Sequence, residues 1–116
     1  MDHVIPREWI DESRMGGFCP LTSAWSCVKP HELIPVEIIQ PPMRDVGVML
    51  DQNGFRKNGI IYTLERIRRA DPIEPIRLWA SPIDTFDYQV RDGFHRYYIA
   101  KTFGYTHIPA DIEHWS

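Results

Sequence analysis

The chain has 116 residues, a formal net charge of -3 and a hydrophobic fraction of 43%. This length suffices for one domain with a single core, and the composition is that of an ordinary globular protein, which excludes disorder and a coiled coil. The acidic balance argues against wrapping of duplex nucleic acid, which needs a basic face, although a local basic patch stays possible. Because the sequence has neither a long apolar run nor a signal-peptide pattern, we expect a cytoplasmic protein without membrane contact.

Cys19 and Cys27 are the two cysteines, and no histidine stands at a matching metal-ligand spacing near them. A structural zinc site needs about four ligands in close pairs. Disulfides are rare in small intracellular domains. We therefore expect reduced cysteines and no metal site.

Residues 1–30 show no hydrophobic periodicity, apart from a short helix predicted within residues 7–15. Trp9 and Trp25 are expected to anchor this segment, since burying an aromatic ring removes much apolar surface from water. We expect an irregular N-terminal arm over residues 1–30, packed on a domain over residues 31–116.

A short apolar run over residues 33–39 predicts a strand, which the two prolines that follow must end because proline donates no ladder hydrogen bond. Residues 49–62 carry two Asn-Gly turn signals, at positions 53–54 and 58–59, with Arg56 and Lys57 between them. This composition predicts a basic, mobile loop that is a candidate lid.

The second half of the chain alternates between helix and strand patterns. Residues 62–72 predict a helix that Thr63 caps and Pro72 ends. Alternating apolar positions predict two adjacent strands, and a second helix, stopped by a glycine, and a last strand follow. These segments are residues 75–80, 87–92, 95–103 and 107–112. The pattern predicts an α/β (α+β) domain with a small mixed sheet and flanking helices.

The segment DGFHR joins the predicted second strand to the second helix. A helix start leaves backbone N–H groups without partners, and the peptide dipoles add partial positive charge there. Gly93 has no Cβ and lets a ligand approach the backbone, Arg96 offers a planar fork for two phosphate oxygens, and His95 donates a hydrogen bond. We predict a phosphate site here; the alternative is a structural Arg96 paired with Asp92 or Asp87.

The segment DGFHRYYIAKTFGYTHIPADI resembles the signature of the ParB/sulfiredoxin superfamily, in which a Gly-x-His/Arg-Arg-Tyr motif opens a helix and an Ile-Pro strand follows. The likeness extends back through DYQVRDG, TLERIRRADPIEPIRLW and PVEIIQPPMR, and so covers residues 34–112. It implies a stand-alone ParB/sulfiredoxin-like domain that binds a nucleotide, ATP, ADP or CTP, with Mg²⁺. The residues that match the motif are Gly93, His95 and Arg96. Members of the superfamily reduce sulfinic acids with ATP, hydrolyse CTP, phosphorylate free serine or act as nucleases, and fold does not choose among these activities.

Departures from the superfamily narrow the choice. Phe94 stands where sulfiredoxins carry their catalytic cysteine, so a sulfiredoxin-type reductase is excluded. Arg44 is similar to the superfamily's Pro-Arg position, and Lys57 and Thr63 stand near the nucleotide contacts of the sulfiredoxin helix. These three residues are therefore further candidates for binding the nucleotide.

Phosphoryl transfer needs a carboxylate that orients the attacking hydroxyl or helps to hold Mg²⁺. Asp92, Glu37 and Asp45 are the acids near the motifs, and Asp92 joins His95 and Arg96 as the candidate catalytic group. We do not expect a metal cluster at the C-terminal histidines, because alternation along a strand separates them. The aromatic residues of the last helix and strand are either core or a stacking surface for a base.

The leading hypothesis is therefore a Mg²⁺-dependent phosphotransferase or hydrolase that uses a nucleotide. The alternatives are a non-catalytic nucleotide- or DNA-responsive module that acts with a partner protein, and a ParB-like nuclease, which the acidic balance disfavours. The sequence predicts no oligomeric state.

Overall fold

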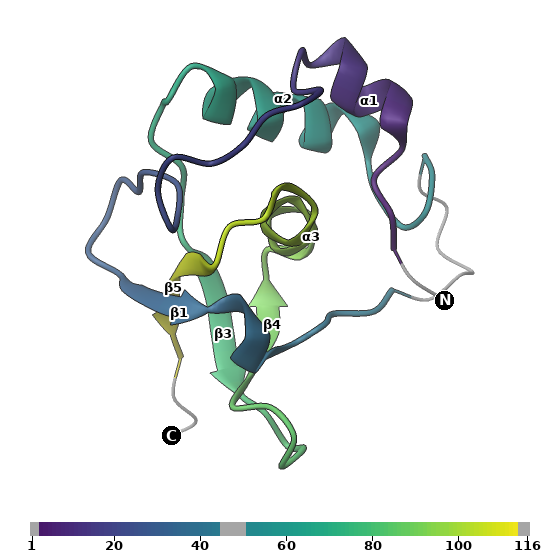
Figure 1. Ribbon diagram of the computed structural model, residues 1–116. Coiled ribbons are helices and arrows are strands. Elements are labelled where there is room, and N and C mark those ends of the chain that lie inside the picture. The colour runs from purple at the N-terminus through teal and green to yellow at the C-terminus, as the bar shows by residue number, and fades with distance from the viewer. Residues whose placement is uncertain (1–2, 45–50, 114–116) are drawn as a thin grey trace.

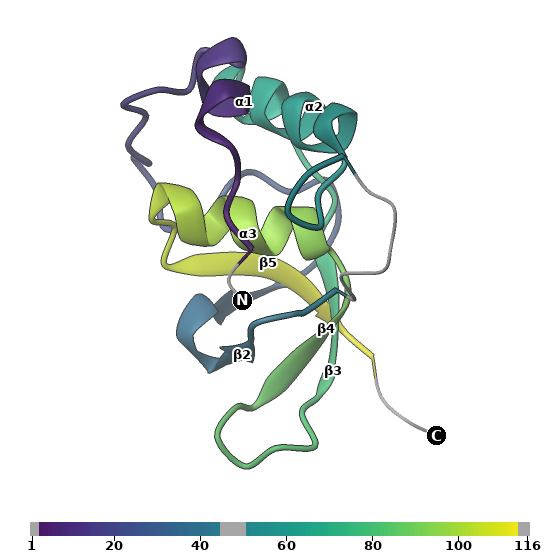
Figure 2. The ribbon, with the colours of Figure 1, turned by 90° about the vertical axis from the view of Figure 1, so that its right-hand side faces the viewer.

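A curled five-stranded mixed sheet forms one side of the molecule, with strand order β1-β5-β3-β4-β2. The computed structural model describes residues 3–44 and 51–113. Helix α3 lies on the sheet, and α1 and α2 lie above α3 (Figures 1 and 2). The elements in chain order are α1 (Arg7–Glu12), β1 (Glu32–Pro35), the 3-10 turn η1 (Val36–Ile38), β2 (Ile39–Gln40), α2 (Lys57–Arg68), β3 (Ile76–Ala80), β4 (Tyr88–Asp92), α3 (Phe94–Phe103) and β5 (His107–Ile112).

The predicted strand over residues 33–39 is in fact two strands separated by η1. Strand β1 pairs antiparallel with β5, whereas β2 pairs in parallel with β4, so consecutive segments lie at opposite edges of the sheet. The break follows from Pro35, whose φ of -58° leads into η1, and from the Val36 N–H, which donates to the Thr106 carbonyl over 2.9 Å. The central strand β3 pairs with both β4 and β5.

Helix α3 forms the centre of the core because it has neighbours on both sides. Its buried residues are Phe94, Tyr97, Tyr98, Ile99 and Ala100. Helix α2 buries Ile60, Leu64 and Ile67 toward the core, and the sheet contributes β3 and β5 residues from below. The burial of Tyr97, Tyr98 and Tyr105 assigns these aromatic rings to the core rather than to an open stacking surface.

The arm is held on the domain by its two tryptophans, Trp9 and Trp25, each with 6% of its surface exposed. Cys27 forms an isolated parallel bridge with Ile73, and both Cys19 and Cys27 are free. No helix in the described ranges combines the length and the apolar character that a membrane crossing needs.

Helix α2 begins at Lys57, six residues before the predicted N-cap Thr63. Its first turn is stabilised by Asp51, whose carboxylate accepts the Lys57 backbone N–H over 2.7 Å. The second predicted turn, at Asn58-Gly59, is therefore helical. Phe55, which is fully buried, anchors the preceding turn. Residues 57–59 of the predicted loop are therefore helical, and a lid formed by the turn before them stays a prediction.

Candidate functional site

His95 lies in the first turn of α3 and packs against the first turn of α2. Its Nε2 accepts a hydrogen bond from the Arg56 backbone N–H over 3.0 Å. A Cβ on Gly59 would lie 3.4 Å from the His95 ring, so this glycine allows the close approach of the two helices. With Nε2 as the acceptor, neutral His95 carries its proton on Nδ1.

The positive charges of three arginines act on the His95 ring. Burial, which is the largest cause, and the charges of Arg44, Arg56 and Arg96 together lower the pKa of His95 to about 4. Burial and the charge of Arg56 also lower the pKa of the Arg44 guanidinium. The imidazole is therefore neutral at physiological pH within a region of positive potential, which favours an anion.

Arg44 follows β2 and is fixed by several contacts. Its Nη1 donates to the Gly54 carbonyl over 2.7 Å, and its guanidinium carbon lies 4.1 Å from the centre of the Phe94 ring. Its backbone N–H donates to Nε2 of His3 over 3.2 Å. The structure thus brings Arg44 and His95 into one region, although they are about fifty residues apart in the sequence.

A cavity of about 320 Å³ adjoins this region along α2. Thr63 lies one helical turn after Gly59 and donates to its carbonyl over 3.0 Å, so one face of α2 runs from His95 to the cavity. The cavity brings together Thr63 and Arg96, both predicted nucleotide contacts. It is lined by Val28, Tyr62, Thr63, Arg66, Pro72, Ile73, Glu74 and Arg96.

Tyr62 and Arg66 are two cavity residues that the sequence did not single out as site residues. The Arg66 guanidinium donates to the Tyr62 hydroxyl over 3.4 Å and to the Pro72 carbonyl over 2.5 Å. Its carbon lies 5.6 Å from the centre of the Tyr62 ring. The sequence signal for this pair is its i, i+4 spacing on a helix. The same spacing is common on helix faces that only contact solvent, so it does not by itself indicate a binding site.

Arg96 makes structural contacts, including one with Asp92, which the sequence analysis gave as the alternative to a phosphate contact. Its Nη1 donates to the carbonyls of Glu74 and Pro75 over 2.8 and 2.9 Å, and Nη2 lies 3.7 Å from the Asp92 carboxylate. Burial lowers the pKa of Arg96, and the charges of Asp92 and Glu74 oppose this shift. Half of the guanidinium fork is therefore committed to the loop before β3. The carboxylate of Asp92, the predicted catalytic acid, faces Arg96 and is 65% exposed.

Gly93 is required by packing on β3. It is buried with a φ of +126°, and a Cβ at this position would lie 2.5 Å from the Ile76 side chain. The close approach of Ile76 is thus a packing reason for this glycine, and the approach of a ligand to its backbone stays a prediction.

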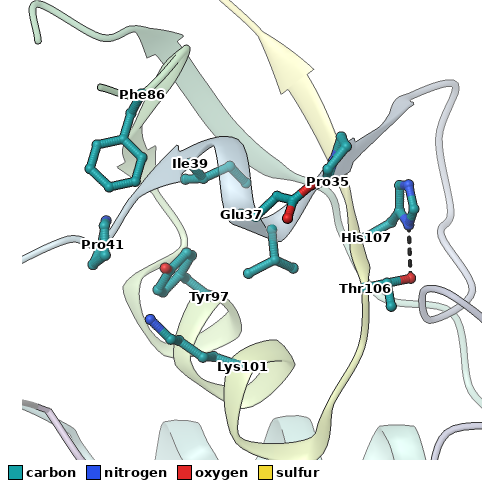
Figure 3. A pocket seen from close by; sticks show the side chains of 10 residues that line it. Pro35, Glu37, Ile39, Pro41, Phe86, Tyr97, Lys101, Thr106 and His107 are labelled. Carbon is teal, nitrogen blue, oxygen red and sulfur yellow. Dashed lines mark hydrogen bonds between the residues drawn. The ribbon is translucent and has the colours of Figure 1, made fainter. Parts of the chain in front are cut away.

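The other predicted site residues lie elsewhere. The ammonium of Lys57 points toward α1 and lies 3.3 Å from the Glu12 carboxylate. Glu37 lies in η1 and lines a second cavity, on the face of α3 that carries Tyr97 (Figure 3). Asp45 lies outside the described residues. Lys57 and Glu37 therefore do not face His95.

The donor set near the cavity does not fit a protein-built Mg²⁺ site. Asp92 pairs with Arg96, and Glu74 pairs with Lys29 over 2.9 Å. Within residues 3–44 and 51–113, no three His, Cys, Asp or Glu side chains are grouped closely enough to hold a metal ion. Mg²⁺ is usually held by substrate phosphates together with one or two carboxylates, and both acids here are already paired.

The fold defines the class: the chain has a ParB-like fold. Its structure is similar to that of the C-terminally truncated chromosome-partitioning protein ParB from Caulobacter crescentus, solved with CTP-γ-S, with a TM-score of 0.52 and 25% identity. The similarity covers 76% of this chain and 46% of the ParB chain. This comparison confirms the predicted mixed α/β class.

The sequence is also 31% identical over 84 residues to an ATP-dependent L-serine kinase from Staphylothermus marinus. The matched region is 72% of this chain and 33% of the kinase, so the chain spans about a third of that protein. No family model matches the sequence.

Proposed function

We propose that the chain binds a nucleoside triphosphate between α2 and α3 and transfers its γ-phosphoryl group to the hydroxyl of a small acceptor. The observation that carries the proposal is the contact of His95 with the Arg56 backbone N–H, next to the 320 Å³ cavity that Thr63 and Arg96 line. The charges of Arg44, Arg56 and Arg96 add positive potential at His95. The ParB neighbour with its CTP analogue and the serine kinase relative support the nucleotide and the acceptor chemistry respectively.

The arginines stabilise negative charge on the phosphates, and His95 orients a phosphate oxygen through a hydrogen bond. Negative phosphate oxygens offset the mutual repulsion of Arg44 and Arg56, and guanidinium groups stabilise the charge on a phosphoryl group during transfer. In the reaction, the bond from the γ-phosphorus to the bridging oxygen breaks and the nucleoside diphosphate leaves with that oxygen. The acceptor oxygen bonds to the phosphorus, and the proton of the acceptor hydroxyl passes to water. The Nδ1–H of neutral His95 donates a hydrogen bond to a phosphate oxygen.

A specific observation favours a second candidate, binding without turnover. The two acids next to the cavity, Asp92 and Glu74, are both ion-paired. Among the described residues this leaves no unpaired carboxylate there to orient an acceptor hydroxyl. A nucleotide-responsive module that acts with a partner protein needs no such group.

Thermal shift and product analysis separate the two candidates. Wild-type protein is incubated with ATP, CTP, ADP or inorganic phosphate, with and without L-serine, and melting temperature and phosphorylated product are both measured. A ligand that binds only the native state raises the melting temperature. At a hundredfold excess over Kd, it adds about 2.7 kcal/mol to the free energy of unfolding. We expect a shift with a triphosphate, and equal amounts of nucleoside diphosphate and phosphorylated acceptor.

Arg56→Met is the diagnostic variant because the Arg56 side chain is exposed while its charge acts on His95. Arg68→Met is the matched control, an exposed arginine at the other end of the same helix. We expect Arg56→Met to weaken triphosphate binding about tenfold, since a charge-assisted hydrogen bond contributes about 1.5–3 kcal/mol, and Arg68→Met to bind as wild type does. A melting shift without product supports the second candidate, and no shift with any nucleotide contradicts both.

A further inference from the structure

A second cavity lies away from His95 and has its own polar groups. Its volume is about 610 Å³, within the range of small-molecule sites. It lies between η1, β2 and the face of α3 that carries Tyr97 and Lys101 (Figure 3). The lining residues are Pro35, Val36, Glu37, Ile39, Pro41, Phe86, Tyr97, Lys101, Thr106 and His107.

The Tyr97 hydroxyl is an unused hydrogen-bonding group at this cavity. The side chain is 1% exposed, and within the described ranges it forms no hydrogen bond. Burial raises the pKa of Tyr97 to about 12, so the hydroxyl remains a donor. Because Tyr97 lines the cavity, a ligand bound there can accept the hydrogen bond of this hydroxyl.

Two opposite charges line the same cavity without pairing with each other. The Lys101 ammonium lies 5.9 Å from the Tyr97 ring centre, and no described acid forms an ion pair with it. In Figure 3 the Lys101 ammonium and the Tyr97 hydroxyl lie on one side of the cavity, while Glu37 comes from η1. Glu37 likewise has no ion pair within residues 3–44 and 51–113. A simple anion would be repelled by Glu37 and a simple cation by Lys101.

We infer that this cavity binds a small zwitterion with an apolar body, the chemistry of a free α-amino acid with an aromatic or branched side chain. Lys101 and Tyr97 receive the carboxylate, Glu37 receives the ammonium, and Ile39 and Phe86 provide apolar walls for the side chain. His107 also lines the cavity, and its Nδ1 is bonded to the Thr106 hydroxyl over 2.8 Å.

The site is distinct from the nucleotide site. Tyr97 and Lys101 are one helical turn apart on α3 and face η1, whereas His95 contacts α2 and Arg96 contacts the loop before β3. An amino acid bound here is therefore a second ligand and does not accept the phosphoryl group.

The test is a calorimetric titration of the full chain with three probes of one shape. L-phenylalanine carries both charges, 3-phenylpropionate lacks the ammonium, and phenethylamine lacks the carboxylate. We expect L-phenylalanine to bind at least about tenfold more tightly than either truncated probe, because each loses one charge-assisted contact. Equal binding of the three probes, tighter binding of a truncated probe, or no L-phenylalanine binding up to about 10 mM would overturn the proposal.

Substitutions test which cavity residue contacts the ammonium of the ligand and which contacts its carboxylate. Glu37→Gln removes the advantage of L-phenylalanine over 3-phenylpropionate, and Lys101→Met removes its advantage over phenethylamine. Tyr97→Phe keeps the packing and weakens both carboxylate-bearing probes. Lys57→Met, whose ammonium pairs with Glu12 on the other side of the molecule, is the control that binds as wild type does. Lys101→Met retains the nucleotide-induced thermal shift, so failure of this proposal and failure of the proposed function are read separately.

Discussion

His3 holds the backbone of Arg44: the Arg44 N–H donates to Nε2 of His3 over 3.2 Å, while Nδ1 of the same ring lies 2.7 Å from the Asn53 carbonyl. The ring therefore donates at Nδ1 and accepts at Nε2. The Asn53 side chain returns a hydrogen bond to the Val4 carbonyl over 2.8 Å. One histidine of the arm thus joins the segment that carries Arg44 to the turn before α2.

We predict that His3→Phe weakens nucleotide binding about three- to tenfold, because it removes two hydrogen bonds that position Arg44. The new ring keeps the contact that His3 makes with Phe94, at 4.8 Å between ring centres, so the melting temperature changes little. Calorimetry on His3→Phe and His3→Gln measures the effect. The glutamine offers an acceptor to the Arg44 N–H and is expected to restore part of the affinity. His31→Gln is the matched control, since the His31 ring bonds, among the described residues, to the nearby Lys29 carbonyl alone. Wild-type affinity in His3→Phe would contradict this role.

The lowered pKa of His95 predicts a specific pH dependence of stability. The folded state holds this pKa at about 4, below the ordinary 6.5. Protonation therefore favours the unfolded chain, and the stabilising contribution of neutral His95 is complete above pH 6.5 and is lost as the pH falls through 4. We expect the melting temperature of wild type to fall more steeply between pH 7 and pH 4 than that of His95→Gln. Parallel curves for the two proteins would contradict the assignment.

An anion at the site is expected to raise the pKa of His95, because it offsets the charges of Arg44, Arg56 and Arg96. The measurement is an NMR titration of the His95 ring protons with and without bound nucleotide. An unchanged titration midpoint in the presence of a saturating nucleotide would place the phosphates away from this histidine.

Gly93→Ala is expected to destabilise the fold by about 2 kcal/mol or more, since overpacking and a positive φ are each costly. A Cβ here meets Ile76 at 2.5 Å. The double variant Gly93→Ala/Ile76→Ala relieves the clash but keeps the backbone strain at φ +126°. Ile76→Ala is therefore expected to lower the free energy of unfolding less in the Gly93→Ala protein than in wild type. Denaturant unfolding of the four proteins measures this coupling. Gly17→Ala, where the φ is +77° and the added Cβ meets nothing, isolates the backbone term.

Arg96 and Asp92 are expected to respond unequally although they form one ion pair. Asp92→Asn changes stability by less than about 1 kcal/mol, because the carboxylate is 65% exposed and solvent screens the pair. Arg96→Met leaves the Glu74 and Pro75 carbonyls without their donor and costs about 1–3 kcal/mol. Chemical denaturation of both variants checks the order, and a larger loss for Asp92→Asn would reverse the roles.

Local signals predicted the second half of the chain well. The strands β3, β4 and β5 and helix α3 begin within a residue or two of the predicted bounds, because alternation and turn residues act over short distances. Gly104, predicted to stop α3, has a left-handed φ of +87°. The start of α2 was missed because its stabilising contact comes from Asp51, outside the helix, and tertiary contacts routinely override a turn signal.

The candidate site was only partly predictable for the same reason. The motif located His95 and Arg96, and a resemblance located Arg44 and Thr63 near them. The sequence contains no sign that Arg96 would bond to two carbonyls or that Lys57 would pair with Glu12, because both partners are brought in by packing. The charge environment of His95 likewise exists only after β2, α2 and α3 have met.

The edge position of β1 has a consequence for how the protein folds as it is synthesised. Its ladder partner is β5, so Glu32↔Ala110 is a contact across most of the chain. Until residues 107–112 have left the ribosome, the first strand has an unsatisfied row of backbone groups, and closing so long a loop is slow. The sheet is therefore completed late, and a nascent chain that is interrupted before β5 exposes a strand that can add to a neighbouring polypeptide.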